Sequence, residues 1–198
     1  MQDNEKHRSR MVRKKGVVDA AIARADQDKG LLLVLTGNGK GKSSSAFGMV
    51  VRTLGYGKKA GVAQFVKSRR DSGEESFLSV QEGVKWHVLG DGYTWETQNR
   101  DSDIATAERG WKVAQDMLRD SSLHLVVLDE LTYLLKYGYL DMQRVCSDLA
   151  ARPPMQHVVV TGRAAPERLV EMADTVSEIR DIKHAFRAGV RAQPGIDL

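Results

Sequence analysis

The chain has 198 residues, with 41% hydrophobic residues, 30 Lys or Arg, 26 Asp or Glu and a formal net charge of +4. This length suits one domain with an ordinary hydrophobic core, and the mild charge favours an anionic partner such as a nucleotide without indicating nucleic acid. A single cysteine, Cys146, excludes a disulfide framework and a cysteine-based metal site. With no apolar run near the roughly 18 residues of a membrane span and no secretory signal, a cytoplasmic protein is expected.

The first part of the chain, residues 1–29, is expected to be a flexible N-terminal segment. Residues 1–10 are polar, which predicts disorder. Residues 11–27 predict a short amphipathic helix, with apolar side chains such as Val18 and Ile22 on one face and basic side chains opposite. Two interpretations stay open: a solvated tail that docks on the body of the protein, or a mobile lid over a ligand.

Residues 30–198 are expected to form a single domain, in which short apolar runs alternate with helical patterns. Runs bounded by turn residues are typical of strands buried on both faces. The expected strands are 31–35, 60–66, 84–89, 123–128, 158–160 and 175–179. The expected helices are 42–54, 103–118 (capped by Ser102 or Asp103), 131–136, 141–151 and 167–173. This alternation predicts an α/β fold with a mostly parallel sheet and helices on both faces.

The strongest chemical signal follows the first expected strand, where Thr36-Gly-Asn-Gly-Lys-Gly-Lys-Ser-Ser-Ser45 opens a helix. A glycine-rich loop ending in Gly-Lys-Ser, between a strand and a helix, is typical of a phosphate-binding P-loop. Its glycines let backbone N–H groups turn inward, and the helix N-terminus adds its positive dipole end. Lys42 is expected to contact phosphate oxygens, and Ser43 to offer its hydroxyl to magnesium. The expected ATP-binding residues are Gly37, Asn38, Gly39, Lys40, Gly41, Lys42, Ser43 and Ser44.

The loop departs from the usual spacing by one residue. The standard motif has four residues between its first glycine and Gly-Lys, whereas Gly37 leaves three before Gly41 and Thr36 stands in the glycine position. The loop is therefore either shorter or holds the triphosphate differently. The alternative is a glycine-rich turn with two surface lysines.

A second signal is the run His124-Leu-Val-Val-Leu-Asp-Glu130, a buried strand that ends in two carboxylates. In P-loop proteins such a strand brings an acid to the metal, at the edge where α/β sheets bind ligands. The expected metal ligands are Ser43, Glu130 and Asp129, and the pattern does not decide which acid contacts the metal. The alternative is that both acids cap the next helix.

The polar segment from Gly90 to Asp101 carries Tyr93 and Trp95 in a connection between a strand and a helix. These aromatic residues could be packing anchors or the wall of a pocket for a flat ligand. The residues alone thus predict a magnesium-dependent nucleotide-binding domain, without its reaction.

Four segments together resemble the ATP:corrinoid adenosyltransferases of the bacterial cobalamin pathway. They are the shortened loop, the aromatic segment, Val-Val-Leu-Asp-Glu-Leu-Thr-Tyr, and Lys183-His-Ala-Phe-Arg-Ala-Gly-Val-Arg-Ala-Gln-Pro-Gly-Ile-Asp197. The resemblance runs from about residue 30 to the end and implies a RecA-like P-loop architecture. It implies transfer of the 5′-deoxyadenosyl group of ATP to the Co(I) of cobalamin, cobinamide or a precursor, with release of triphosphate, in adenosylcobalamin synthesis or salvage.

The resemblance also implies the metal, the oligomeric state, the electron donor and the corrinoid contacts of this reaction. It implies Mg²⁺ or Mn²⁺, a homodimer, and reduced flavodoxin or another reduced flavin as electron donor. No side chain acts as acid or base, because the nucleophile is the cobalt of the substrate. Tyr93 and Trp95 would crowd the lower face of the corrin ring, which makes Co(II) easier to reduce, and the N-terminal helix would cover the corrinoid.

Two other functions fit parts of the sequence. One is a P-loop phosphotransferase or ATPase acting on another small molecule, which would form ADP. The other is a nucleotide-gated regulator that binds nucleic acid through the basic residues of the N-terminal segment. Neither a membrane nor nucleic acid is the expected partner.

Overall fold

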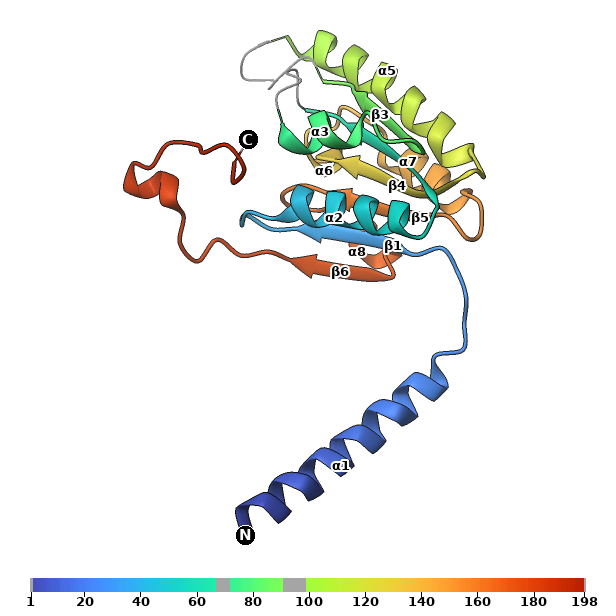
Figure 1. Cartoon of the computed structure of the whole chain (residues 1–198). Coiled ribbons are helices and arrows are strands. Elements are labelled where there is room, and N and C mark those ends of the chain that lie inside the picture. Colours follow the sequence, from blue (N-terminus) through green and yellow to red (C-terminus); the bar gives the residue numbers. More distant parts are fainter. Residues whose placement is uncertain (1, 67–71, 91–98, 198) are drawn as a thin grey trace.

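The computed structural model describes residues 2–66, 72–90 and 99–197. Its centre is a six-stranded sheet, in which every paired strand runs parallel to its neighbour, in the order β3-β2-β4-β5-β1-β6 (Figure 1). The strands are β1 (Leu32–Thr36), β2 (Lys59–Gln64), β3 (Val84–Val88), β4 (Leu123–Asp129), β5 (His157–Thr161) and β6 (Thr175–Glu178). All six strands expected from the sequence are present, with small shifts at their ends.

Helices cover both faces of the sheet, as predicted. One face packs against α2 (Lys42–Gly55) and the short α3 (Gly73–Leu78). The opposite face carries the larger hydrophobic core. Its helices are α5 (Arg100–Arg119), α6 (Leu131–Lys136), α7 (Met142–Ala150) and α8 (Glu167–Met172). The expected α/β fold is thereby confirmed.

The start of α5 differs from the expected one. The helix begins at Arg100, and its N-cap is Asn99, whose side chain accepts a hydrogen bond from the backbone N of Ser102 at 3.2 Å. Asparagine is as good a cap as serine or aspartate. Ser102 and Asp103, the expected caps, therefore lie inside the first turn.

The N-terminal helix α1 (Gln2–Arg24) is longer than expected. The predicted disorder over residues 1–10 is wrong for residues 2–10, which are helical. Unbranched charged side chains favour helix formation. Ion pairs one turn apart, such as Lys15 Nζ to Asp19 Oδ2 at 2.5 Å, add a small stabilisation of the helix. Residues 4–29 are exposed throughout, and α1 projects away from the end of the sheet where β1 begins (Figure 1). Within the described ranges, no helix has the length and apolar character needed to cross a membrane.

Gly30, just before β1, is buried against the turn that precedes β5. A Cβ at this position would lie 2.3 Å from the carbonyl oxygen of Gln156. We therefore expect Gly30→Ala to lower the free energy of unfolding by about 1–3 kcal/mol, as overpacking does. The matched control is Gly48→Ala in α2, where a Cβ would meet nothing within 4 Å. This substitution should raise the free energy of unfolding by about 0.5–1 kcal/mol. Urea unfolding measures both, and equal shifts would contradict this account.

Candidate functional site

The glycine-rich loop joins the carboxyl end of β1 to the first turn of α2, as predicted. Gly37 and Gly41 have φ angles of 98° and 114°, which glycine adopts without strain. Thr36, at the position of the usual first glycine, has a structural role: its Oγ1 accepts a hydrogen bond from the backbone N of Ala165 at 3.1 Å. This hydrogen bond therefore holds the start of the loop against the segment that follows β5.

Lys42 is the buried cation of this loop. Its side chain folds back so that Nζ donates a hydrogen bond to the carbonyl oxygen of Gly39 at 2.7 Å, and the residue is 7% exposed. Burial lowers the pKa of Lys42, with a further lowering by Arg163, while Glu130 and Asp129 act to raise it. The ammonium group thus lies within electrostatic reach of both acids of the second motif.

Asp129 is fixed at the end of β4 by the two neighbouring strands. It is 1% exposed, and its Oδ1 accepts a hydrogen bond from Thr161 Oγ1 at 2.7 Å. Its Oδ2 accepts one from Gln64 Nε2 at 3.1 Å. The Oε1 of Gln64 in turn accepts a hydrogen bond from Trp86 Nε1 at 3.1 Å. Four strands therefore contribute to the orientation of this carboxylate.

Glu130 starts α6 in a left-handed conformation, with φ 61°. Its backbone N donates a hydrogen bond to Thr161 Oγ1 at 3.0 Å, and its side chain does not cap the helix. The structure thus disagrees with the capping alternative for Glu130. A non-glycine residue in this region stores strain, which is common at functional sites. Gly162 packs closely here, since a Cβ would lie 3.2 Å from Glu130 Oε2.

Gln64, Thr161 and Arg163 are residues of this site that the sequence motifs did not indicate. The first two end the strands β2 and β5, which flank β4, and Arg163 follows two residues after β5. A search for polar residues at the carboxyl ends of all expected strands would have found Gln64 and Thr161, because ligands bind at that edge of α/β sheets.

Tyr93 and Trp95, the expected corrinoid contacts, lie outside the described residues. Within those residues, no group of three or more His, Cys, Asp or Glu side chains could hold a metal ion. The oxygen donors of Ser43, Asp129 and Glu130 nevertheless suit Mg²⁺, which proteins often bind through one or two carboxylates together with substrate phosphates.

The end of the chain returns to the loop. We call residues 180–197, which include the short helix η1 (Ala185–Ala188), the C-terminal strap. The residue just before the strap, Ile179, lies against the loop: its carbonyl oxygen accepts a hydrogen bond from the backbone N of Gly39 at 2.7 Å. The far end of the strap is held by an ion pair between Asp197 and Lys40. The strap is thus attached to the loop at both ends.

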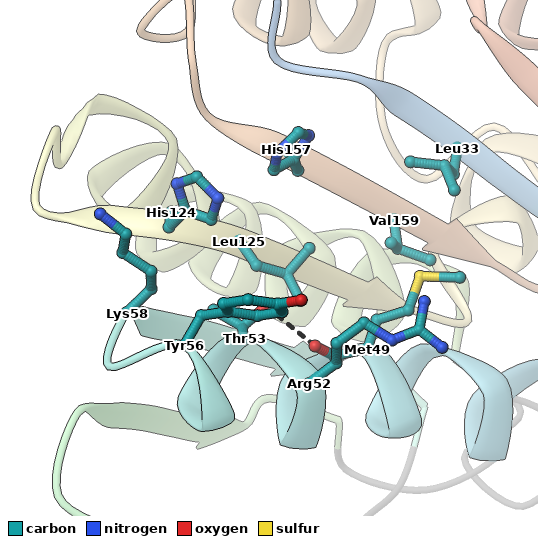
Figure 2. Close-up of a pocket in the computed structure, with 10 residues that line it drawn as sticks. All are labelled: Leu33, Met49, Arg52, Thr53, Tyr56, Lys58, His124, Leu125, His157 and Val159. Carbon is teal, nitrogen blue, oxygen red and sulfur yellow. Dashed lines mark hydrogen bonds between the residues drawn. The ribbon is translucent and has the colours of Figure 1, made fainter. Parts of the chain in front are cut away.

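A separate groove of about 400 Å³ lies beside the second half of α2 (Figure 2). Its floor is apolar and includes Leu33, Leu125 and Val159. His124 and His157, at its rim, have ring centroids 4.8 Å apart. These histidines stand at the starts of β4 and β5, so the groove belongs to the opposite end of the strands from the loop and is not part of this site.

His157 has a structural partner. Its Nδ1 accepts a hydrogen bond from the backbone N of Leu31 at 3.0 Å, and burial, with smaller effects of His124 and Arg152, lowers its pKa.

The parallel sheet, the loop between β1 and α2 and the acids at the end of β4 define a P-loop nucleotide-binding protein. A family model described as ATP:corrinoid adenosyltransferase BtuR/CobO/CobP matches residues 28–198, and one described as Cob(I)alamin adenosyltransferase N terminal matches residues 1–22. The chain therefore belongs to the ATP:corrinoid adenosyltransferase family, which confirms the resemblance seen in the sequence.

Curated relatives agree with this assignment. The chain is 57% identical over 196 residues to a corrinoid adenosyltransferase of Pseudomonas aeruginosa, covering 98% of this chain and 97% of the relative. It is 48% identical over 194 residues to a corrinoid adenosyltransferase of Escherichia coli K12, and 47% identical over 194 residues to corrinoid adenosyltransferase CobA of Salmonella typhimurium. Each of these two alignments covers 98% of both chains.

Proposed function

We propose that this protein transfers the 5′-deoxyadenosyl group of ATP to the Co(I) of a corrinoid. The reaction forms a bond between cobalt and C5′ of the ribose and breaks the bond between C5′ and the phosphate oxygen, so that triphosphate leaves. The observation that carries the proposal is the buried Lys42 of the phosphate loop, folded onto the Gly39 carbonyl oxygen and influenced electrostatically by Asp129 and Glu130, in a chain of this family.

The chain's own residues would bind, orient and stabilise rather than exchange protons. The nucleophile is the substrate cobalt, so a general base is not needed. The loop residues from Gly37 to Ser44 would hold the triphosphate through backbone N–H groups other than that of Gly39, which donates to the carbonyl oxygen of Ile179. Lys42 would stabilise the charge that develops on the leaving group. A favourable interaction of this kind acts where charge increases in the transition state, which raises kcat.

We propose Mg²⁺ or Mn²⁺ as the metal that accompanies ATP. When bound, it would neutralise part of the triphosphate charge. Ser43 would offer its hydroxyl oxygen, and Glu130 and Asp129 their carboxylates. The rigid hydrogen bonds of Asp129 to Thr161 and Gln64 support a fixed position for these donors.

The experiment that tests the proposal is an anaerobic incubation with ATP, Mg²⁺ and chemically reduced cob(I)alamin, followed by separation of the products. Adenosylcobalamin and triphosphate in equal amounts are expected. ADP with the corrinoid unchanged would favour a phosphotransferase or ATPase. Tight nucleotide binding without turnover would favour a regulator.

We also propose a homodimer in which α1 covers the corrinoid of the other copy. In one copy α1 leaves the start of β1, whereas the phosphate loop lies at the other end of that strand (Figure 1). The helix has 23 residues, a length of about 35 Å, enough to extend along another subunit. Its large apolar side chains are exposed in a single copy: Met11, Val12, Val17, Val18 and Ile22. Burial in a dimer would remove them from water.

Trp95 and Tyr93 are proposed to contact the corrin ring and favour reduction of Co(II). We expect Trp95→Ala to keep most activity when the corrinoid is supplied as chemically prepared Co(I). Activity should fall at least about tenfold when the reaction starts from Co(II) with a reduced flavin or flavodoxin. Parallel assays of both reactions measure this, and the Co(I) reaction is the internal control. Equal losses in the two assays would contradict the role in reduction.

A further inference from the structure

The C-terminal strap encloses a cavity of about 470 Å³ that borders the phosphate loop through Lys40. This volume lies in the range of small-molecule sites, about 300–1,000 Å³. All other lining residues belong to the strap. The cavity is therefore a concave surface beside the loop, formed by a segment that has no role yet in the proposed reaction.

The charges that line this cavity are mostly positive. Of its two carboxylates, Asp197 pairs with Lys40, and Asp181 accepts a hydrogen bond from Arg187 Nη2 at 2.5 Å. By contrast, Lys183 and Arg191 line the cavity, are exposed and have no ion-pair partner among the described residues. The cavity thus has neutralised acids and two uncompensated cations.

Neutral and apolar groups complete the lining. His184 accepts a hydrogen bond from the backbone N of Phe186 at its Nδ1, at 3.2 Å, which leaves Nε2 as a donor when the ring is neutral. Phe186 and Ile182 line the cavity as well and are 75% and 85% exposed. A ligand with an apolar body and anionic groups at its edge would match both kinds of surface.

We propose that the strap cavity binds the edge of the corrinoid, and that Lys183 and Arg191 recognise carboxylates there. This inference rests on the proposed function and adds a preference among its substrates. A corrinoid carries acid or amide side chains around an apolar macrocycle, and the two cations distinguish the charged form from the neutral one. The ion pair of Asp197 with Lys40 keeps the strap beside the loop, so the ring edge and the triphosphate are held by neighbouring parts of the chain.

The test compares two corrinoid substrates in the full-length enzyme: cob(I)yrinic acid a,c-diamide, which keeps free carboxylates, and cob(I)inamide, whose side chains are amides. The double variant Lys183→Gln/Arg191→Gln should raise the KM of the carboxylate form about tenfold, as expected for two exposed charge contacts. The KM of cobinamide and the KM of ATP should change less than about twofold. The control is Lys58→Gln, an exposed lysine just before β2, at the opposite end of the strands from the phosphate loop. This substitution should change neither the KM of the corrinoids nor the KM of ATP.

Three results would overturn the inference. An equal rise in KM for both corrinoids means that the two cations do not recognise carboxylates. A rise in the KM of ATP alone means that Lys183 and Arg191 bind the triphosphate instead. The same change in the Lys58→Gln control means a general effect of charge.

Equilibrium dialysis of the two oxidised corrinoids tests the preference without turnover. If the wild-type enzyme adenosylates neither these two substrates nor cob(I)alamin, the proposed function fails, whereas dialysis still decides the inference.

Discussion

Lys42→Ala is expected to lower kcat/KM for ATP by about 10²–10³-fold, the usual cost of removing one preorganised group that stabilises developing charge. The lysine is buried and folds onto the loop, where Nζ contacts the carbonyl oxygen of Gly39. Steady-state kinetics with cob(I)alamin measure the change. Wild-type turnover would refute the assignment of the phosphate loop.

The matched comparison is Lys40→Ala in the same loop. Lys40 is exposed and already paired with Asp197, so its loss should cost less than the loss of Lys42. Urea unfolding of both variants separates an effect on the site from an effect on folding. If the two losses of activity are equal, burial is not what makes Lys42 effective.

The pH dependence gives Lys42 a signature that a structural role would not have. Burial lowers its pKa in the free protein, so it loses its proton at a lower pH than an exposed lysine does. Bound triphosphate favours the charged form and raises the pKa again. The KM for ATP should therefore increase as the pH rises through the lowered pKa. Lys42→Arg should lose this dependence, because a guanidinium group stays protonated.

Local patterns were sufficient to predict the strands and the phosphate loop. Val158–Val160 and Leu125–Leu128 are buried on both faces of the sheet, so each appears as a continuous apolar run. The loop could be recognised because glycine, lysine and serine follow such a run at short spacing. The N-terminal helix was partly missed, since the polar composition of residues 1–10 is shared by disordered and by exposed helical segments.

The partners of the loop could not be predicted from local patterns. Thr161 and Gln64 meet at Asp129 because β5 and β2 flank β4, an order that depends on the whole sheet. Neither residue belongs to a motif, and the expected strand at 60–66 continued past Gln64. The ion pair between Lys40 and Asp197 joins residues 157 positions apart. Such contacts depend on the path of the chain through space.

The two acids of the second motif should respond differently to neutral replacements. Asp129→Asn should lower kcat/KM at least about 10²-fold at every Mg²⁺ concentration and lower the free energy of unfolding by about 1–3 kcal/mol. Both carboxylate oxygens of Asp129 accept buried hydrogen bonds. The amide of asparagine puts an N–H group where one of these acceptors stood. Rotating Gln64 to compensate would break its hydrogen bond with Trp86.

Glu130→Gln should instead leave the free energy of unfolding within about 0.5 kcal/mol of wild type and raise the Mg²⁺ concentration at half-maximal rate about tenfold. Its backbone N, which the substitution keeps, makes the hydrogen bond to Thr161. The loss then concerns the carboxylate charge, which Mg²⁺ prefers to a neutral amide oxygen. Mg²⁺ titrations of the rate and urea unfolding of both variants measure the contrast. A stable Asp129→Asn with a raised Mg²⁺ requirement would make Asp129, rather than Glu130, the main metal ligand of the pair.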